Sequence, residues 1–375
     1  MALAIFLLCA GFVFYAYLLF PLLLHWRARN LPPLSAEPPA EWPTLSIVIA
    51  AHNEAPNLPG KCRSLEALDY PADKVQWVIV SDGSTDNSAD AVRPWFEGRE
   101  DRIFHAYDTP KGKCGALNEG VALATGDVIL FMDARQPVSE NAAKVLVPFL
   151  DKPEFGAATG ELILSDDTSL EAANFGLYWR YEKWIRDNES RLFSTTGVTG
   201  ALYAIRRADF TPNPIGTLLD DFDTPIGLLK QGKRTVFVPG AYAFDAASDD
   251  IKQEFRRKVR NLGGNWQSFM RNKWLFSPSK NPVWLQFLSH KLARLLVPWA
   301  LIGALLAAAL GSGWFLTMAF WVQVAFYGLA VCSYLDLRFA RSGVFNIAKV
   351  FVQMNAAAFV ATLRYFGSRK AISWR

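Results

Sequence analysis

The sequence predicts an α/β domain with a parallel, doubly covered sheet, flanked by transmembrane helices. Three observations point to this fold class. Charge-free apolar stretches lie near both ends of the chain, short apolar runs alternate with helical segments between them, and polar side chains follow those runs. Continuous apolar strands that alternate with helices are typical of parallel sheets covered on both faces.

The composition excludes several classes of protein. The 375 residues are 51% apolar and carry 39 Lys and Arg against 35 Asp and Glu, a net charge of +4. A highly charged disordered chain is excluded because ample apolar surface is available for burial. The small basic excess argues against a dedicated nucleic-acid binder. Cys9, Cys62, Cys114 and Cys332 form no CxxC pair, which argues against a disulfide framework or a cysteine zinc site and fits reduced cytosolic thiols.

Residues 1–24 form the first predicted transmembrane helix. They carry no charged side chain and, at about 1.5 Å per residue, can cross a hydrocarbon core of about 30 Å. Arg27 and Arg29 follow this stretch instead of preceding it, so we expect a retained anchor and not a cleaved signal peptide. The positive-inside rule then places the following domain in the cytoplasm. Residues 25–44, which include five prolines, are expected to be an extended tether.

A C-terminal membrane region of two to three helices is predicted at residues 295–367. Residues 295–335 carry no charge, are about two spans long and contain Gly311-Ser312-Gly313, which indicates a helical hairpin. The basic stretch 337–341 then returns the chain to the cytoplasmic side. Residues 344–366 are interrupted by polar side chains, so they form either a third span or an interfacial helix. Residues 283–294 are expected to be an amphipathic helix on the cytoplasmic surface.

Residues 45–280 are predicted to form the cytoplasmic domain. We expect strands at residues 45–50, 76–80, 103–106 and 127–132, and helices at 55–68, 89–96 and 115–124. In an open parallel sheet, ligands bind beyond the carboxyl ends of the strands. The segments that follow the strands are therefore the candidate site.

Polar side chains follow three of these four strands. The first strand is followed by Ala51-His52-Asn53-Glu54, the second by a segment with Asp82 and Asp86, and the fourth by Asp133-Ala134-Arg135. Asp86 suits a helix N-cap, which is a common structural role for one carboxylate. Acids after three strands at one edge of the sheet are harder to explain by caps, so they predict a site for a polar ligand.

The segment 111–118 precedes a helix and suits an anion. Lys111 and Lys113 stand among glycines there, and a helix N-terminus offers free backbone amides. The alternative is a solvated turn. Neither the GxxxxGK[ST] spacing nor a GxGxxG after the first strand is present, so a P-loop and a dinucleotide fold lose support.

Two later segments also carry charge. Asp220, Asp221 and Asp223 lie among apolar residues and suit acid–base chemistry or a metal; the alternative is the acidic first turn of a helix. Arg257 and Arg260 belong to a basic segment that suits either anionic lipid headgroups or a pyrophosphate leaving group. Their spacing puts both on one helical face.

In this order the motifs make the chain resemble membrane-anchored family 2 glycosyltransferases of GT-A fold, a Rossmann-like fold of nucleotide-diphospho-sugar transferases. The family includes relatives of the cellulose and hyaluronan synthases, and the resemblance covers about residues 45–266. It implies that the segment Ala51-His52-Asn53-Glu54 and Asp82 hold the base and ribose, and that Lys113 also contacts the nucleotide. It implies that Asp133, first in the DxD motif, binds a divalent metal, Mg²⁺ or Mn²⁺. The pair Asp220-Asp221 would supply the general base at Asp221, and Arg260 would match the arginine of the QxxRW motif.

The sequence departs from the family pattern at two places. Arg135 replaces the second aspartate of the DxD motif, so either Asp133 holds the metal with other ligands or Arg135 supplies part of the positive charge at the nucleotide-sugar. The segment from Arg257 to Asn261 lacks the Gln and Trp of the QxxRW motif. That Trp helps to place the acceptor in processive synthases, which argues against a long polymer as the product.

The resemblance implies an inverting membrane glycosyltransferase. It would move a sugar from a nucleotide-sugar, with UDP as the default, to a lipid-linked or membrane-bound glycan acceptor. Asp221 would act as the base, with charge stabilised at Asp133, Arg257 and Arg260. The expected location is a membrane, by default the bacterial inner membrane, with the catalytic domain in the cytoplasm and no nucleic-acid partner. The alternatives are a processive exopolysaccharide synthase and a non-catalytic membrane protein that binds nucleotide-sugars. A sugar nucleotidyltransferase is disfavoured because His52-Asn53-Glu54 stands where a basic glycine-rich loop is needed.

Overall fold

The computed structural model describes residues 1–164, 170–245, 251–335 and 343–367. The chain forms two compact units, and each is described by itself. Among the described residues, the sheet unit comprises 31–164 and 186–245, and the helical unit comprises 1–30, 170–185, 251–335 and 343–367. These units divide at other residues than the predicted 45–280 domain, whose boundaries stay a prediction.

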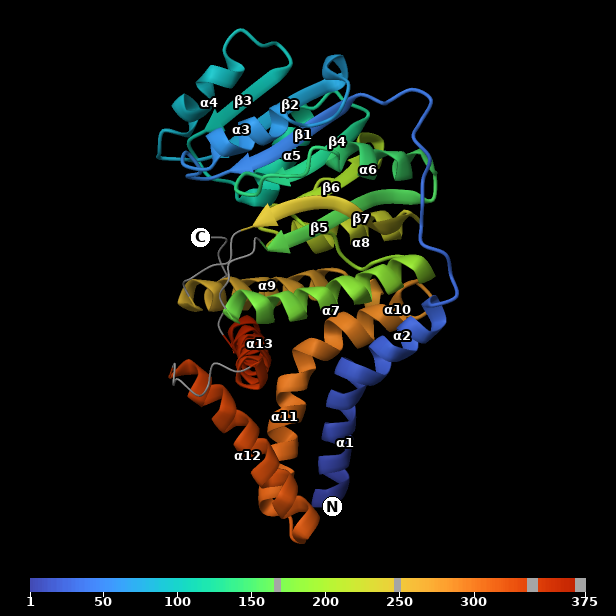
Figure 1. The fold of residues 1–375 in the computed structure, drawn as a ribbon, viewed down its shortest axis with the longest axis vertical. Coiled ribbons are helices and arrows are strands. Elements are labelled where there is room, and N and C mark those ends of the chain that lie inside the picture. Colours follow the sequence, from blue (N-terminus) through green and yellow to red (C-terminus); the bar gives the residue numbers. More distant parts are fainter. Residues whose placement is uncertain (165–169, 246–250, 336–342, 368–375) are drawn as a thin grey trace. The chain divides into compact units, whose positions relative to one another are not determined.

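The sheet unit is built on seven strands (Figure 1). Their order is β3-β2-β1-β4-β6-β5-β7. The strands are β1 (Leu45–Ala51), β2 (Val75–Asp82), β3 (Arg102–Tyr107), β4 (Val128–Asp133), β5 (Phe155–Leu164), β6 (Leu202–Arg206) and β7 (Arg234–Asp245). The four predicted strands are confirmed, and they pair in parallel as expected. The sheet as a whole is mixed, because β6 runs antiparallel to both β4 and β5.

Helices cover both faces of this sheet, as predicted. On β1, Ile47 and Ile49 belong to one core cluster and Val48 to another, as the period of two in a strand requires. The first cluster includes residues of α3 (Leu58–Glu66), α4 (Ser88–Phe96) and α6 (Ala142–Leu146). The second includes residues of α5 (Lys113–Leu123) and α8 (Asp220–Lys230). Burial on both faces explains the continuous apolar runs in the sequence.

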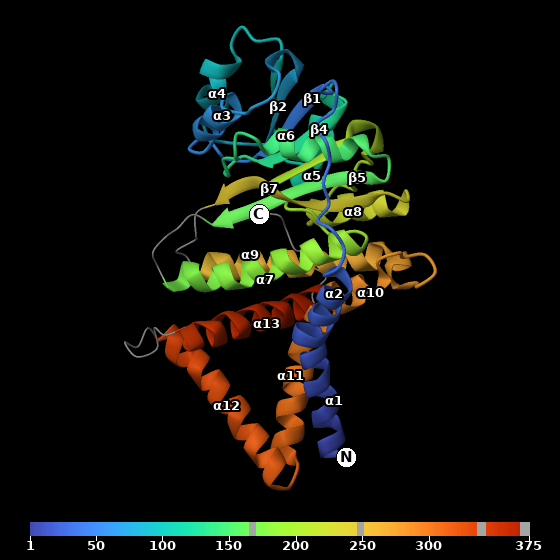
Figure 2. The ribbon, with the colours of Figure 1, turned by 45° about the vertical axis from the view of Figure 1, so that its right-hand side comes forward.

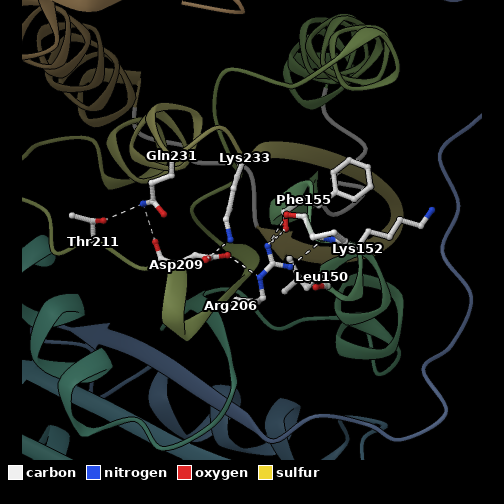
Figure 3. Close-up of polar contacts among 9 residues, drawn as sticks. Leu150, Lys152, Phe155, Arg206, Asp209, Thr211, Gln231 and Lys233 are labelled. Atoms are coloured by element: carbon white, nitrogen blue, oxygen red, sulfur yellow. Dashed lines mark hydrogen bonds and ion pairs between the residues drawn. The ribbon is translucent and has the colours of Figure 1, made fainter.

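A polar clamp at the end of β6 holds the antiparallel strand in place (Figure 3). The Arg206 guanidinium donates hydrogen bonds to the carbonyl oxygens of Leu150 and Phe155, which precede and begin β5. It also pairs with Asp209 at 2.8 Å, and Lys233 next to β7 pairs with the same carboxylate. These contacts tie together the ends of β5, β6 and β7.

The helical unit contains the apolar ends of the chain. The N-terminal helix runs through α1 (Ala2–Phe14), a π-helical turn (Tyr15–Leu19) and α2 (Phe20–Ala28). The later helices are α9 (Ile251–Arg271), α10 (Trp284–Gln286), a π-helical turn (Phe287–Leu292), α11 (Ala293–Leu310), α12 (Trp314–Tyr334) and α13 (Gly343–Gly367). In the long helix α7 (Leu170–Leu192), the residues up to Ile185 belong to this unit and the remaining residues belong to the sheet unit. Short 3₁₀ turns lie at Ala72–Lys74, Val147–Asp151, Arg207–Asp209 and Lys273–Phe276.

Four helical segments among the described residues are long and apolar enough to cross a membrane. They are Ala2–Ala28, Trp284–Leu310, Trp314–Tyr334 and Phe345–Gly367. The helix Trp284–Leu310 is continuous, so residues 283–294 do not form a helix separate from the first helix of the predicted hairpin. The hairpin bend falls at Gly311–Gly313, as predicted. The basic stretch 337–341 lies outside the described residues.

Helix α13 differs from the other three in its surroundings. Figures 1 and 2 together show it lying across α11 and α12, beside α9. Val259 of α9 packs against Ala357 and Ala361, and the Trp266 indole donates a hydrogen bond of 2.9 Å to the Thr362 hydroxyl. In α13, 56% of the apolar stretch is buried inside the protein, against 11% of the apolar stretch of α12. Packing on an amphipathic helix thus takes up the face of α13 that a lone span would expose.

Candidate functional site

The loops after β1 and β2 are bound to each other at the carboxyl edge of the sheet. Asn53 has a positive φ of 56°, and its side-chain oxygen accepts a hydrogen bond of 2.8 Å from the Thr85 backbone N–H. His52 Nδ1 contacts the Asp82 carbonyl oxygen at 2.6 Å. Asp86 accepts a bond of 2.9 Å from the Ala55 N–H as well as bonds from Ser88 at the start of α4. Asp86 therefore has a structural role, but the N-cap position of α4 is occupied by Asn87 and not by Asp86 as expected.

Asp82 is fully buried and organises the loop after β3. Its Oδ1 accepts hydrogen bonds from the Tyr107 hydroxyl at 2.8 Å and the Lys111 N–H at 2.6 Å, and its Oδ2 accepts one from the Gly112 N–H at 2.9 Å. The structure thus assigns the carboxylate a position inside the loop that leads into α5. A direct contact of Asp82 with a nucleotide stays a prediction.

Asp82→Asn is expected to lower the free energy of unfolding by about 2–4 kcal/mol, because an amide group replaces one oxygen that accepts backbone N–H bonds. Denaturant or thermal unfolding of the purified full chain measures this loss. Asp90→Asn is the control: Asp90 is exposed and pairs only at the surface with Arg93, so a change within about 0.5 kcal/mol is expected. Equal effects of the two substitutions would contradict the organising role of Asp82.

Lys113 joins two carboxylates at the centre of the candidate site. It begins α5, and its Nζ lies 2.9 Å from Asp133 Oδ1 at the end of β4 and 3.3 Å from Asp220 Oδ2 at the start of α8. Burial alone would lower the pKa of Lys113, but the carboxylates of Asp133, Asp220 and Asp221 outweigh burial and raise that pKa well above its usual value. Lys113 is therefore a cation held between the end of β4 and the start of α8.

Asp221 is the more accessible member of the acidic pair. Asp220 is 4% exposed, whereas Asp221 is half-buried and lies next to Gly200. A Cβ atom at Gly200 would lie 3.5 Å from both Asp221 Cβ and Lys113 Nζ. The glycine loop before β6, which contains Gly197 and Gly200, therefore comes close to both of these side chains. The acids do form the first turn of α8, as the alternative interpretation of this segment expects, and Asp220 and Asp221 also lie near Lys113.

Arg135 lies at the rim but is paired. Its Nη2 is 3.0 Å from Asp245 Oδ2 at the end of β7, and Asp245 also accepts a hydrogen bond of 3.0 Å from Gln136. Arg257 and Arg260 lie on α9 in the helical unit, where Arg257 pairs with Glu254 at 2.8 Å. The structure brings together the loops after β1 and β2, and separately Lys113, Asp133 and the acidic pair. The approach of Arg257 and Arg260 to these residues stays a prediction.

The donor set at Asp133 fits a metal ion that is bound together with a diphosphate. Among the residues that the structure describes, no three His, Cys, Asp or Glu side chains are grouped as metal ligands. Asp133 offers one carboxylate, 33% exposed, of which Oδ1 contacts Lys113. Mg²⁺ in nucleotide sites commonly takes one or two carboxylates, with phosphate oxygens and water as its other ligands. The neighbouring Cys114 is no competing ligand or nucleophile, because burial and Asp220 raise the pKa of its thiol.

Two residues near the site escaped the sequence analysis, Lys61 and Asp245. Lys61 is buried on α3, and its Nζ donates a hydrogen bond of 2.7 Å to the Gln136 carbonyl oxygen. A signal for it existed, because Leu58, Cys62 and Leu65 form an apolar helical face with Lys61 in its middle. Asp245 ends a strand that is separated from Arg135 by 110 residues, so no local pattern could pair them.

The pH dependence of stability is expected to report the burial of Lys61. Burial lowers the pKa of Lys61 from 10.5 to about 7, with Asp133 partly opposing the shift. Between these two values the unfolded chain keeps a proton that the folded chain has lost, so the free energy of unfolding rises with pH in this window. Thermal unfolding of the native chain and of Lys61→Met at several pH values measures the difference. A difference that stays constant across the window would contradict a neutral buried lysine.

Part of the chain matches a known protein family. Residues 46–211 match the family model described as Glycosyl transferase family 2. The probable glycosyltransferase YdaM of Bacillus subtilis is 27% identical over 255 residues, which cover 63% of this chain and 58% of that protein. An N-acetylglucosaminyltransferase of Mesorhizobium japonicum is 28% identical over 254 residues, covering 62% of this chain and 58% of its own. The chain thus spans less than three fifths of the length of these two relatives.

A solved structure shows the same fold. The mannosyltransferase PcManGT of Pyrobaculum calidifontis, in complex with GDP-Man and Mn²⁺, has a TM-score of 0.78 and covers 99% of this chain and 100% of its own, with 24% sequence identity. The predicted fold class is therefore confirmed. Residues 46–211 thus match glycosyltransferase family 2, the fold is of the GT-A type, and the same chain has helices that are long and apolar enough to span a membrane.

Proposed function

We propose that the protein is a glycosyltransferase that moves a sugar from a nucleotide-sugar to a hydroxyl group of an acceptor. One observation carries the proposal: Lys113 joins Asp133 and Asp220, with Asp221 beside them, at the carboxyl edge of the sheet. A cation next to an accessible carboxylate provides both charge for a diphosphate and a base for a hydroxyl. The family match and the two glycosyltransferase relatives support this assignment.

The reaction we infer is a single displacement with inversion at the anomeric carbon. Asp221 accepts the proton of the acceptor hydroxyl while the oxygen of that hydroxyl forms the new bond to the anomeric carbon. The bond from this carbon to the diphosphate oxygen breaks, and its electron pair leaves with the nucleoside diphosphate. Lys113 lies where the growing negative charge can be stabilised. Inversion follows because a single base acts and no side chain of the protein becomes covalently attached.

A divalent ion fits this site through Asp133. When bound, Mg²⁺ or Mn²⁺ would neutralise charge on the departing diphosphate. Asp133 would hold the ion together with the phosphate oxygens, and Lys113 would pass from the carboxylate to the diphosphate. Arg135 adds positive charge at the rim, although Asp245 offsets part of it. The Mn²⁺ in the mannosyltransferase complex supports this use of a metal.

The membrane helices support an acceptor at the membrane. The basic residues after the first apolar stretch favour a cytoplasmic sheet unit and, by default, the bacterial inner membrane. We infer that α13 is interfacial, because it lies across α11 and α12 and packs on the basic helix α9 (Figure 2). A lipid-linked or membrane-bound glycan is the acceptor that this placement favours. UDP-sugars are the default donors.

Release of nucleoside diphosphate tests the proposal. Detergent-solubilised membranes that contain the native chain or Asp221→Asn are supplied with UDP- and GDP-sugars and a lipid extract, with and without EDTA. We expect release from one donor, which Asp221→Asn and EDTA both abolish. Product length separates a single transfer from the processive alternative. Nucleotide binding without release from any donor would replace the proposal by the non-catalytic alternative.

A further inference from the structure

Lys61 is a buried amino group that the proposed reaction does not use. It lies on α3 with 2% of its surface exposed, among Leu58, Cys62 and Leu65. A lysine in an apolar helical face costs free energy that a methionine there would not. Its Nζ has a partner in the Gln136 carbonyl oxygen at 2.7 Å. The lysine therefore links α3 to the segment that follows β4.

Helix α3 holds this segment at two points. Besides the bond from Lys61 to Gln136, the Ser64 hydroxyl accepts a hydrogen bond of 3.0 Å from the Val138 N–H. Lys61 and Ser64 lie three residues apart, on one face of the helix. Both bonds fall within five residues of Asp133, the proposed ligand of the diphosphate and its ion.

Strand β7 holds the same segment from its other side. The Phe244 N–H donates to the Pro137 carbonyl at 2.9 Å, and the Ser139 N–H donates to the Tyr242 carbonyl at 2.9 Å. Asp245 adds its contacts to Arg135 and Gln136. The segment 134–139 is thus fixed between α3 and β7, and Lys61 supplies the bond nearest to Asp133 from α3.

We propose that Lys61 is a positioning residue for the donor site: by holding the Gln136 carbonyl it fixes the segment after β4 and with it the carboxylate of Asp133. The inference rests on the proposed function, because it assigns Asp133 to the donor diphosphate. It adds a residue that touches neither the substrate nor the reacting atoms. Replacing a residue that orients a binding side chain without touching the ligand commonly changes the affinity for that ligand about 10–100-fold.

The test uses the purified full chain in detergent, with four variants. Lys61→Met removes the hydrogen bond, and Lys61→Arg keeps an N–H donor of similar reach. Ser64→Ala removes the second bond of α3 to the same segment. Lys144→Met is the matched control, because Lys144 is a surface lysine that pairs with Asp69. Calorimetry measures the binding of UDP and GDP with Mn²⁺, steady-state kinetics measures KM for the donor and kcat, and thermal unfolding monitors the fold.

We expect Lys61→Met to weaken nucleoside diphosphate binding about tenfold and to raise KM for the donor by a similar factor, with a smaller change in kcat. Lys61→Arg should recover most of the affinity, and Lys144→Met should match the native chain. A purely structural role would instead lower the thermal midpoint and the active fraction without changing KM. Native affinity and KM in a folded Lys61→Met would overturn the inference.

Three further outcomes are decisive. If Lys61→Met does not fold, Ser64→Ala decides: weaker donor binding in that variant supports the inference, and native binding overturns it. If the native chain releases nucleoside diphosphate while all variants behave like it, the inference fails and the proposed function stands. If the native chain neither binds nor releases nucleoside diphosphate, both fail.

Discussion

Asp221→Asn is expected to lower kcat for sugar transfer by about 1,000-fold, because an amide cannot accept the proton of the acceptor hydroxyl. The loss should fall on kcat and not on donor affinity, since Asp133 and Lys113 remain in place. The half-buried position of Asp221 beside the glycine loop, against the burial of Asp220, is the reason to assign the base to this member of the pair.

The measurement is single-turnover transfer from the donor identified by the release assay, combined with calorimetric titration of the nucleoside diphosphate. Asp73→Asn is the control, because Asp73 is an exposed residue in a surface turn. It should leave both quantities unchanged. A variant Asp221→Asn that retains transfer within about tenfold of the native rate would remove Asp221 as the base and turn attention to Asp220.

Lys113→Met is expected to weaken nucleoside diphosphate binding about 100-fold, which corresponds to about 2.7 kcal/mol. The substitution removes the cation that lies 2.9 Å from Asp133 and 3.3 Å from Asp220, and leaves these two acids without the charge between them. An anionic ligand then meets a more negative site.

Lys111→Met provides the matched control. Lys111 stands two residues earlier, but its ammonium group pairs with Glu119 at the surface, where both side chains are about two fifths exposed. Its contact with Asp82 uses the backbone N–H, which the substitution keeps. Calorimetry should therefore show nearly native binding for Lys111→Met. Equal losses in the two variants would show that the site responds to net charge and not to the position of Lys113.

The first half of the fold could be predicted because its strands are buried on both faces and follow one another along the chain. The apolar runs at 45–50 and 127–132 indicate strands that are buried on both faces, and the polar residues after them indicate the carboxyl edge of the sheet. The reversal at β6 could not be predicted in this way, because apolar alternation carries no direction. The strand is held by Arg206, whose guanidinium binds backbone carbonyl groups that no sequence pattern identifies.

A residue of the site could be predicted from the sequence only where it belongs to a single sequence motif. Lys113, Asp133, Asp220 and Asp221 each stand at the end of an element that the sequence indicated, and the structure brings them together. The environment of Asp82 was not predictable, since a carboxylate after a strand can face a ligand or fold back on its own loop. The Arg135–Asp245 pair requires β7 to lie next to the segment after β4, which is a property of the tertiary structure alone.

The discontinuity of the helical unit has a practical consequence for anyone who shortens the chain. Its three parts come from the beginning, the middle and the end of the sequence, with the sheet unit inserted between them. A fragment cut to residues 45–280 would keep α9 but lose α13, so Val259 and Trp266 would lose their partners Ala357 and Thr362. Those apolar faces would then meet water, and self-association would follow. A soluble fragment therefore calls for a break on the sheet side of α9, which also removes Arg257 and Arg260, and not at the membrane helices.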